Sequence, residues 1–332
     1  MSTTVAVTGA DGRIGRHVVR QLAEAGYRVR GLDRRPGSEA AEYVVGDMAD
    51  EQALAALLTS ADIVVHLAAL MSWAESDAAA VFDANITATF RLLEAVRTAG
   101  GAEIILASSG EVYPEMAPSY LPIDEDHPRR PRSLYGMTKL LDEEMAWFYA
   151  RRYGMPTTVL RFPHTQDAAE LLDPGSVFSG PRFFLHQKVQ QQRALGNTET
   201  AAVLERYDDG RERLVLSRCP DGTPYQMPIG DARDVATGVV LAVSSQQARG
   251  QTIALGPAEA AAFDVIVPRM SELTGLDYVD VRIPGTGPHY SVDISKARRV
   301  LGYEPAHPIG RMLEDAASAY HQRQAAAAPP VE

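Results

Sequence analysis

A strand, a glycine-rich turn and a helix follow one another at the start of the chain, and this order constrains the fold more than any other feature. Residues 3–8 predict a short buried strand, and residues 17–23 carry apolar side chains at helical spacing. Between them stands Gly9-Ala10-Asp11-Gly12-Arg13-Ile14-Gly15. In such a turn Gly9 permits a tight bend, Gly12 lets the backbone approach a pyrophosphate, and Gly15 lets the helix pack closely on the strand. The unit predicts a dinucleotide site at the helix N-terminus.

The second predicted strand, residues 28–32, ends at Asp33, which lies 21 residues after Gly12. This is the position that binds the ribose of a dinucleotide. A carboxylate there accepts hydrogen bonds from a 2′-hydroxyl and repels a 2′-phosphate, which favours NAD over NADP. Arg34 and Arg35 follow directly and could hold a phosphate, so NADP stays open.

Composition excludes several classes of protein. With 332 residues, 45% of them hydrophobic, the chain can bury one large core or two modest ones. Its apolar stretches, such as residues 63–70, are too short to cross a bilayer, and the first ten residues read as a strand rather than a signal peptide. A single cysteine, Cys219, excludes an internal disulfide and is typical of the cytoplasm, where we expect the protein. The formal charge of −11 argues against nucleic-acid and membrane partners, and we expect no metal ion.

Strands and helices alternate through the first half of the chain. Strands are predicted near Val44 and at residues 63–67, 103–107 and 157–160, and helices at residues 51–58, 78–98 and 134–153. Such alternation predicts right-handed crossovers and a doubly wound parallel sheet of the Rossmann type.

The expected fold class is therefore α/β, with a smaller C-terminal α/β substrate-binding domain. We expect the NAD-binding domain over residues 1–164, with a return near 228–256, and the substrate-binding domain over 165–227 and 257–324. Helices at 232–243 and 264–274 and a strand at 252–255 are predicted in the second half. Turn signals predict a hairpin-like insertion at 196–229, and residues 325–332 are expected to be disordered.

Tyr135 and Lys139 lie one turn apart on the predicted helix 134–153 and so share a face. An ammonium beneath a phenol favours its ionised form, which makes Tyr135 a candidate proton shuttle near neutral pH. Ser109 follows the strand 103–107, at the edge where parallel sheets bind ligands. Oxidising a secondary alcohol needs a base, a donor that holds the oxygen, and a hydride acceptor. Tyr135, Ser109 and NAD would supply these three functions.

With these motifs in place, the chain resembles the extended short-chain dehydrogenase/reductase family, which contains the sugar-nucleotide epimerases and dehydratases. The resemblance covers nearly the whole length and rests on motifs in the family's order: Thr8-Gly9-x-x-Gly12-x-x-Gly15, Gly46-Asp47, His66-Leu67-Ala68-Ala69, Asn85, Ser108-Ser109, Tyr135-x-x-x-Lys139, Leu160-Arg161, and the run from Asp293 to Pro305.

The resemblance implies a nucleotide-sugar substrate, bound NAD, and a homodimer formed by residues 78–98 and 134–152. It implies that Lys139 bonds the nicotinamide ribose. The implied cofactor-binding residues are Gly9, Asp11, Gly12, Arg13, Ile14, Gly15, Asp33, Arg34, Asp47, Met48, Leu67, Ala68, Ala69, Ser108, Tyr135, Lys139, Phe162 and Pro163.

Glu111 bears on the chemistry after hydride removal. The family's dehydratases and uronate decarboxylases carry Glu at this position, whereas simple 4-epimerases carry a small or hydroxylic residue. A carboxylate there could take the C5 proton of a 4-keto intermediate or handle a C6 substituent; a loop Glu without a catalytic role is the alternative. The commonest dehydratases also carry Asp just before this Glu, where the present chain has Gly110, and this argues against standard 4,6-dehydration.

Two further positions bear on the substrate. His164 stands near the place of an Asn in many relatives and is expected beside the sugar or pyrophosphate, as a packing replacement or as an extra acid or base. Arg282 matches a diphosphate-binding Arg of the family. Residues 227–231 lack the Arg and His that relatives often carry there, which weakens the nucleotide-sugar assignment.

Three functions are compatible with the sequence. The first is a redox-neutral enzyme that oxidises a nucleotide sugar transiently at C4, with Tyr135 as base, and then epimerises, eliminates or decarboxylates. The second is a net NAD(P)-dependent dehydrogenase or reductase on a free sugar, ketosugar or other secondary alcohol. The third is a noncatalytic dinucleotide sensor, which the intact Ser109, Tyr135 and Lys139 disfavour.

Overall fold

The computed structural model describes residues 2–37 and 42–327. Contacts divide the chain into two compact units. The first comprises Met1–Pro163, Ala232–Gly256 and Val292–Pro305, and the second comprises His164–Asp231, Pro257–Ser291 and Ala306–Glu332. The segment 292–305 thus lies in the first unit, whereas the sequence placed it in the second. Within the described residues, no helix is long and apolar enough to span a membrane.

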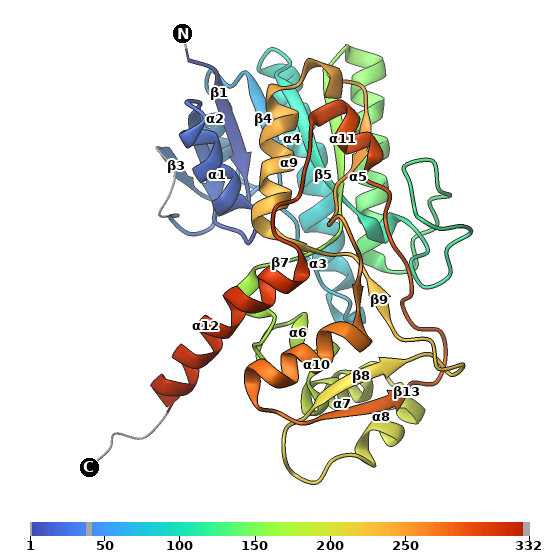
Figure 1. Cartoon of the computed structure of the whole chain (residues 1–332). Coiled ribbons are helices and arrows are strands. Elements are labelled where there is room, and N and C mark those ends of the chain that lie inside the picture. Colours follow the sequence, from blue (N-terminus) through green and yellow to red (C-terminus); the bar gives the residue numbers. More distant parts are fainter. Residues whose placement is uncertain (1, 38–41, 328–332) are drawn as a thin grey trace. The chain divides into compact units, whose positions relative to one another are not determined.

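The first unit is built on a seven-stranded parallel sheet with the strand order β11-β6-β5-β4-β1-β2-β3 (Figure 1). The strands are β1 (Thr4–Thr8), β2 (Arg28–Asp33), β3 (Glu42–Val45), β4 (Ile63–His66), β5 (Glu103–Ser109), β6 (Thr157–Phe162) and β11 (Thr252–Ala254). Since β1 is central and the chain winds outward from it in both directions, the carboxyl ends of β1 and β4 meet where the winding reverses. The predicted α/β fold with a doubly wound parallel sheet is confirmed.

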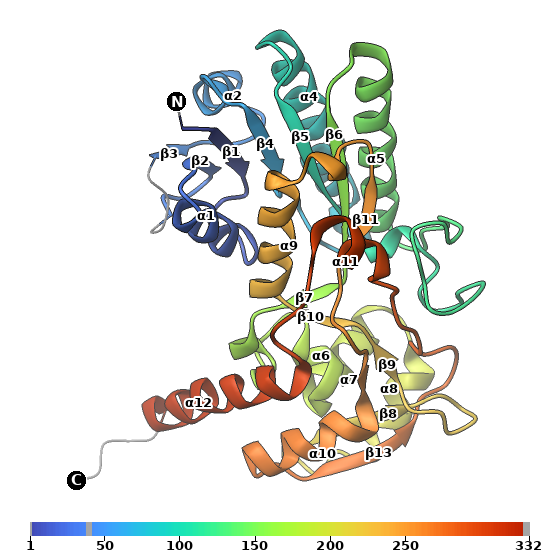
Figure 2. The same cartoon turned by 45° about the horizontal axis from the view of Figure 1, so that its top comes forward.

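Helices cover both faces of this sheet (Figure 2). They are α1 (Gly15–Glu24), α2 (Glu51–Leu58), α3 (Ala78–Phe82), α4 (Ala88–Thr98), α5 (Leu134–Tyr153), α9 (Ala232–Ser244) and α11 (Ser295–Leu301). Side chains that alternate along the strands divide the core in two: Val5 and Val7 pack with α1, α9 and α11, while Ala6 packs with α2, α4 and α5. The predicted helix 78–98 is continuous through a π-helical turn, Asp83–Thr87, between α3 and α4.

The second unit contains five helices of the described chain and three two-stranded pairs. The helices are α6 (Ser179–Phe183), α7 (Leu185–Ala194), α8 (Thr198–Glu205), α10 (Phe263–Thr274) and α12 (Ile309–Ala327). The strands are β7 (His164–Gln166), β8 (Leu214–Arg218), β9 (Gln226–Met227), β10 (Ile229–Asp231), β12 (Ala261–Ala262) and β13 (Tyr278–Arg282); they pair as β10-β7, β12-β9 and β13-β8.

Two predictions for the second half hold only in part. Within the hairpin-like insertion predicted at 196–229, a tight turn forms at Asp221-Gly222 with an antiparallel bridge between Arg218 and Pro224, but α8 occupies the start of the segment and β8 pairs in parallel with the distant β13. Turn signals are local, and they do not reveal a strand partner more than sixty residues away. The tail expected at 325–332 begins as the last turn of α12, which runs to Ala327; residues 328–332 lie outside the described part.

Candidate active site

A cavity of about 750 Å³ lies in the first unit, at the carboxyl ends of its central strands. The glycine turn, the ends of β2 and β3, the segment after β4, and the α3–α4 region form its walls. Its volume is that of a small-molecule or cofactor site. Ten of the predicted cofactor-binding residues line it: Gly9, Asp11, Gly12, Asp33, Arg34, Asp47, Met48, Leu67, Ala68 and Ala69.

The glycine turn is closely packed on its inner side. Gly9 has a φ of +66°, and a Cβ there would lie 2.8 Å from the backbone nitrogen of Ala68. A Cβ on Gly15 would lie 2.0 Å from the carbonyl oxygen of Gly9. The turn that lines the cavity with Gly9 and Gly12 can therefore lead directly into α1 only because glycines allow the backbone to fold tightly there, as a pyrophosphate site requires.

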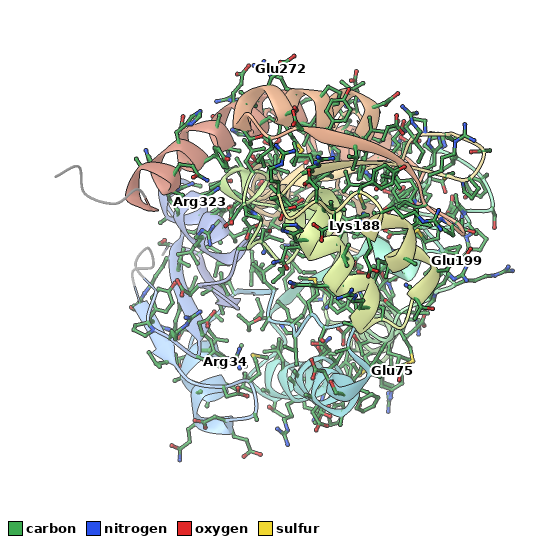
Figure 3. All side chains as sticks on the ribbon, turned by 90° about the horizontal axis from the view of Figure 1, so that it is seen from below. Arg34, Glu75, Lys188, Glu199, Glu272 and Arg323 are labelled. Carbon is green, nitrogen blue, oxygen red and sulfur yellow. The ribbon has the colours of Figure 1, made fainter. Side chains whose placement is uncertain are left out.

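Asp33 is held rigidly at this cavity. Its Oδ2 accepts a hydrogen bond from the backbone N–H of Asp11 at 3.0 Å, and its Oδ1 accepts one from the backbone N–H of Arg34 at 2.7 Å. Each carboxylate oxygen retains a lone pair for a ligand hydroxyl. The side chain of Arg34 is exposed at the rim (Figure 3), and Arg35 also lines the cavity.

Other predicted cofactor residues lie elsewhere. Ile14 and Phe162 pack in the core between the sheet and the helices α1, α9 and α11. The buried hydroxyl of Ser108 lies 2.5 Å from Oε1 of Glu143, so the structure does not support a cofactor contact through this side chain. Arg13, Gly15, Tyr135, Lys139 and Pro163 are not among the residues that line the cavity, and their cofactor contacts stay predictions.

The sequence missed one wall of the cavity. It comes from α3, the π-helical turn and α4, and comprises Ala80, Asp83, Ala84, Thr87, Ala88 and Arg91. Small residues and a single Arg on a helix do not form a pattern that is typical of a ligand site, so the sequence did not predict this wall.

Tyr135 lies in the first turn of α5, and Lys139 one turn later. The helix begins at Ser133, whose Oγ accepts a hydrogen bond from the backbone N–H of Gly136 at 2.9 Å. Ser109, the last residue of β5, similarly accepts one from the backbone N–H of Glu111 at 3.1 Å. This bond uses an oxygen lone pair, so the hydroxyl proton of Ser109 remains available to a ligand.

Glu111 ties these elements together. Its carboxylate accepts hydrogen bonds from the hydroxyl of Ser133 and, at 3.2 Å, from the indole N–H of Trp73. The Trp73 ring lies 6.5 Å from that of Tyr135, between centroids. A Cβ on Gly136 would lie 2.3 Å from the carbonyl oxygen of Glu111, so α5 and the Glu111 turn are in direct contact. The structure therefore brings a carboxylate, an aromatic face and the phenol of Tyr135 together.

Lys139 is paired with a neighbouring carboxylate on the same helix. Its Nζ lies 2.9 Å from Oδ2 of Asp142, and both side chains are buried. Burial raises the pKa of Tyr135 above its ordinary value, and the carboxylates of Glu111 and Asp142 raise it further. In this state the pKa of Tyr135 is therefore raised, chiefly by burial, whereas the spacing predicted that Lys139 lowers it.

Asn85 and His66 have structural partners. Asn85, in the π-helical turn, accepts from the N–H of Leu70 at 2.8 Å and donates to the carbonyl of Leu70 and to Oγ1 of Thr138. His66 lies between the hydroxyls of Thr8 and Thr89, at 2.7 and 2.9 Å. Burial lowers the pKa of His66 to about 3, so it is neutral. These contacts hold the segment after β4 beside α5.

Two of the predicted substrate residues, His164 and Arg282, lie in the second unit, whereas Ser109 lies in the first. His164 begins β7, opposite Ile229 of β10. Arg282 is the last residue of β13, and its side chain is exposed. Its guanidinium lies beside Gly222, since a Cβ built on that glycine would be 3.5 Å from Nη2 of Arg282. The substrate contacts of His164 and Arg282 stay predictions.

Three residues of the site escaped the sequence analysis. Ser133 stands just before the helix and is a typical N-cap, a signal that was available. Asp142 lies three residues after Lys139, where a carboxylate shares its face. Trp73 lies in an irregular segment, and no pattern identified it.

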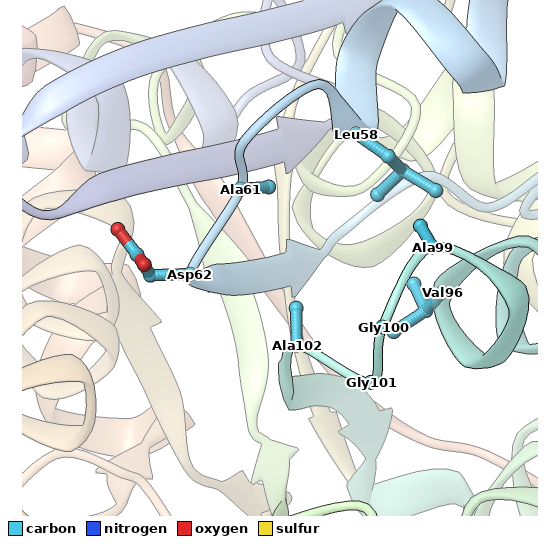
Figure 4. A pocket seen from close by; sticks show the side chains of 8 residues that line it. All are labelled: Leu58, Ala61, Asp62, Val96, Ala99, Gly100, Gly101 and Ala102. Carbon is cyan, nitrogen blue, oxygen red and sulfur yellow. The ribbon is translucent and has the colours of Figure 1, made fainter.

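A smaller cavity of about 280 Å³ lies at the opposite edge of the sheet, where β4 and β5 begin (Figure 4). Among the described residues that line it, Asp62 is the one with a charge, and its Oδ2 accepts a hydrogen bond from the N–H of Thr4 at 2.8 Å. The remaining lining is apolar or glycine. The cavity therefore offers no chemistry comparable to that of the larger one.

Comparisons with known proteins agree with this architecture. Residues 5–166 match the family model described as the NAD dependent epimerase/dehydratase family. A short-chain dehydrogenase/reductase superfamily protein from Agrobacterium tumefaciens, crystallised with bound NAD, is 46% identical with a TM-score of 0.92; the match covers 97% of this chain and 98% of that one.

Two curated relatives differ in activity. The UDP-glucose 4-epimerase of Lactobacillus helveticus is 27% identical over 91% of this chain and 92% of its own. The L-arabinose 1-dehydrogenase (NAD(P)(+)) of Haloferax volcanii is 34% identical over 69% of this chain and 89% of its own. From the shared fold, the glycine turn and these matches, the chain belongs to the extended short-chain dehydrogenase/reductase family, in its NAD-dependent epimerase/dehydratase group.

Proposed function

We propose that the protein is an NAD-dependent enzyme that converts a nucleotide sugar by transient oxidation at C4, with Tyr135 as the base. The observation that carries this proposal is the cluster at the start of α5, where Tyr135, Ser109 and Glu111 are linked through Ser133 and Gly136. Similarity to UDP-glucose 4-epimerase over nearly the whole chain supports the substrate class.

The residues present fit NAD. The tight glycine turn leaves the start of α1 open to a pyrophosphate, and the fixed carboxylate of Asp33 suits a ribose diol. Asp47, Met48 and Leu67 would contact the adenosine half. Bound NAD would supply a hydride acceptor that later returns the hydride. The carboxylate of Asp33 supports NAD over NADP.

The protein's own groups would divide the remaining work. Ser109 donates a hydrogen bond to the reacting oxygen of the sugar, which holds it in place. Tyr135 takes the hydroxyl proton as the C4 carbonyl forms, and returns it when the carbonyl is reduced. Lys139 holds the cofactor ribose. Glu111, beside Tyr135, acts on the intermediate in an elimination or decarboxylation, and would be dispensable in a plain epimerisation.

A cofactor and substrate assay tests this proposal. Purified protein should carry NAD and convert a UDP- or dTDP-hexose, followed by NMR, without net change in absorbance of reduced nicotinamide. Tyr135→Phe should reduce turnover by about 10²–10⁴-fold while NAD stays bound, and Tyr153→Phe, at the far end of the same helix, serves as the control. Glu111→Gln then separates the reactions, because only a plain epimerase survives it.

A net dehydrogenase is the second candidate, favoured by the similarity to L-arabinose 1-dehydrogenase and by the missing cation at 227–231. Such an enzyme would release reduced nicotinamide in stoichiometric amounts from a free sugar. Protein that is empty of cofactor and turns over a non-nucleotide alcohol would decide for it.

We also propose a homodimer formed by residues 78–98 and 134–152. Large apolar side chains are exposed along α4 and α5, among them Phe90 at 49% and Phe148 at 51%. Exposed apolar surface of this kind marks an interaction site, and Leu141 on α5 extends it.

A further inference from the structure

The neighbourhood of Lys139 contains a carboxylate that the proposed reaction does not use. Asp142 lies on the same face of α5 and has no exposed surface. Its Oδ2 accepts a hydrogen bond from Lys139 Nζ at 2.9 Å. Its Oδ1 is buried and has no hydrogen-bond partner within the described residues. A buried carboxylate with an unsatisfied oxygen is costly for stability, so its presence beside Lys139 calls for an explanation.

A chain of hydroxyls leads to Asp142 from the glycine turn. The Oγ1 of Thr8 accepts hydrogen bonds from the backbone N–H groups of Leu67 and Ala68, both at 3.2 Å, so its own proton is directed at Nδ1 of His66. His66 is then protonated at Nε2 and donates to Oγ1 of Thr89. Thr89 lies beside Asp142, and burial raises the pKa of Asp142 above its ordinary value although Lys139 and Thr89 lower it.

Charged groups surround Tyr135 and Asp142 on several elements of the first unit. The turn after β5 contributes Glu111, and α5 contributes Asp142 and Lys139. Around Asp142 itself lie Lys139, Thr89 and Glu143, and His66 of β4 faces Lys139. Glu143 is already paired with Arg161 at 2.8 Å. Two carboxylates therefore oppose ionisation of the phenol, and Asp142 is the one that also binds the ammonium.

We propose that Asp142 is a positioning residue of the active site, which holds the Lys139 ammonium in place on the face of α5 that carries Tyr135. The proposal rests on the proposed role of Tyr135 as base. Asp142 acts through Lys139 and through its charge, and it does not touch the reacting atoms.

The test uses full-length, NAD-loaded protein and two readouts. Tyrosine labelled with ¹³C at Cζ reports the ionisation of Tyr135 by NMR, with the signal assigned by its absence in Tyr135→Phe. The pH dependence of kcat/KM with UDP-glucose is the second readout. Asp142→Asn removes the charge but keeps an oxygen that accepts from Lys139.

We expect Asp142→Asn to shift the Tyr135 ionisation midpoint downward by roughly one pH unit or more, the scale of a nearby charge. The rising limb of the kcat/KM profile should shift by the same amount. Glu144→Gln, which removes an exposed carboxylate from the same helix, should shift neither. An unchanged NMR midpoint in Asp142→Asn would overturn the proposal.

A second variant keeps the test decisive if Asp142→Asn does not fold. Asp142→Glu retains the charge but displaces the ammonium. The rising limb of the kcat/KM profile should therefore stay within about half a pH unit of the wild type, while the pH-independent value of kcat falls. An unchanged kcat would contradict the positioning role. Wild-type protein that converts no UDP-hexose refutes the proposed function, whereas the NMR titration still decides the effect of Asp142 on Tyr135.

Discussion

The hydroxyl of Ser133 donates to the carboxylate of Glu111 and at the same time accepts from the backbone of the helix that carries Tyr135. One side chain therefore fixes both the start of α5 and the carboxylate that we associate with the choice of reaction. The base and Glu111 are parts of one hydrogen-bonded unit.

Replacing Ser133 with Ala should affect stability and activity together. Loss of the N-cap should lower the free energy of unfolding by about 1 kcal/mol, and the freed Glu111 should reduce kcat/KM. Urea unfolding and steady-state kinetics measure the two effects. Ser133→Thr keeps the hydroxyl and should restore both; a variant in which only stability falls would disprove the link to Glu111.

The buried His66 predicts an acid-sensitive fold. Its pKa is lowered to about 3 in the folded protein, whereas an unfolded chain protonates near 6.5. Its contribution to stability is therefore complete above pH 6.5 and is lost as the pH falls toward 3, by about 1.4 kcal/mol per unit. Urea unfolding at pH 7, 6 and 5 should show this slope, and His66→Gln should be less stable at pH 7 but flatten it. Equal slopes for both proteins would argue against a neutral His66.

Asp33 should control the choice between the two nicotinamide cofactors. Asp33→Asn removes the negative charge at the cavity wall, so affinity for NAD should fall about tenfold and affinity for NADP should rise, consistent with the value of a charged hydrogen bond. Calorimetric titration at fixed ionic strength measures both constants. Arg34→Ala should weaken only NADP. If Asp33→Asn leaves the ratio of affinities unchanged, Asp33 does not contact the ribose.

Gly15 should tolerate no side chain. A Cβ there would lie 2.0 Å from the carbonyl of Gly9, so Gly15→Ala should destabilise the protein by about 1–3 kcal/mol and reduce the amount of NAD retained on purification. Thermal unfolding and cofactor release measure these losses. Gly310→Ala is the matched control, because nothing lies within 4 Å of its Cβ position on α12; it should be neutral or slightly stabilising.

The exposed apolar face of α4 and α5 should mediate self-association. Placing a charge there, as in Phe90→Glu or Phe148→Glu, should convert a dimer into a monomer in analytical ultracentrifugation, because an interface core does not accommodate unpaired charges. Val265→Glu, at a 68% exposed position on α10, should have no effect. A monomeric wild type would rule out the proposed interface.

Local patterns predicted the first unit well. Helices at 51–58 and 134–153 match α2 and α5, because apolar spacing and capping residues record helix ends directly. The second unit was harder, since β8 pairs with β13 through contacts that no local pattern encodes. Parallel pairing of strands far apart in the chain depends on tertiary packing.

The candidate site shows the same division. The glycine turn, Ser109, Tyr135 and Lys139 stand at fixed spacings that their chemistry requires, and the sequence identified them. The electrostatic setting did not follow from spacing, because the pKa of Tyr135 depends on burial and on Glu111, which is distant in sequence. The ion pair between Asp142 and Lys139 was also missed, although the two residues lie only three positions apart.

Gly136 limits how such a chain can change by mutation. Since a Cβ at this position would collide with the Glu111 turn, any side chain at position 136 would push the base-bearing helix away from that turn. Substitutions that redirect the reaction at this turn can therefore change the side chains of Glu111 and Trp73, but not position 136. Directed evolution toward a different sugar chemistry should accumulate changes at these two positions and leave Gly136 untouched.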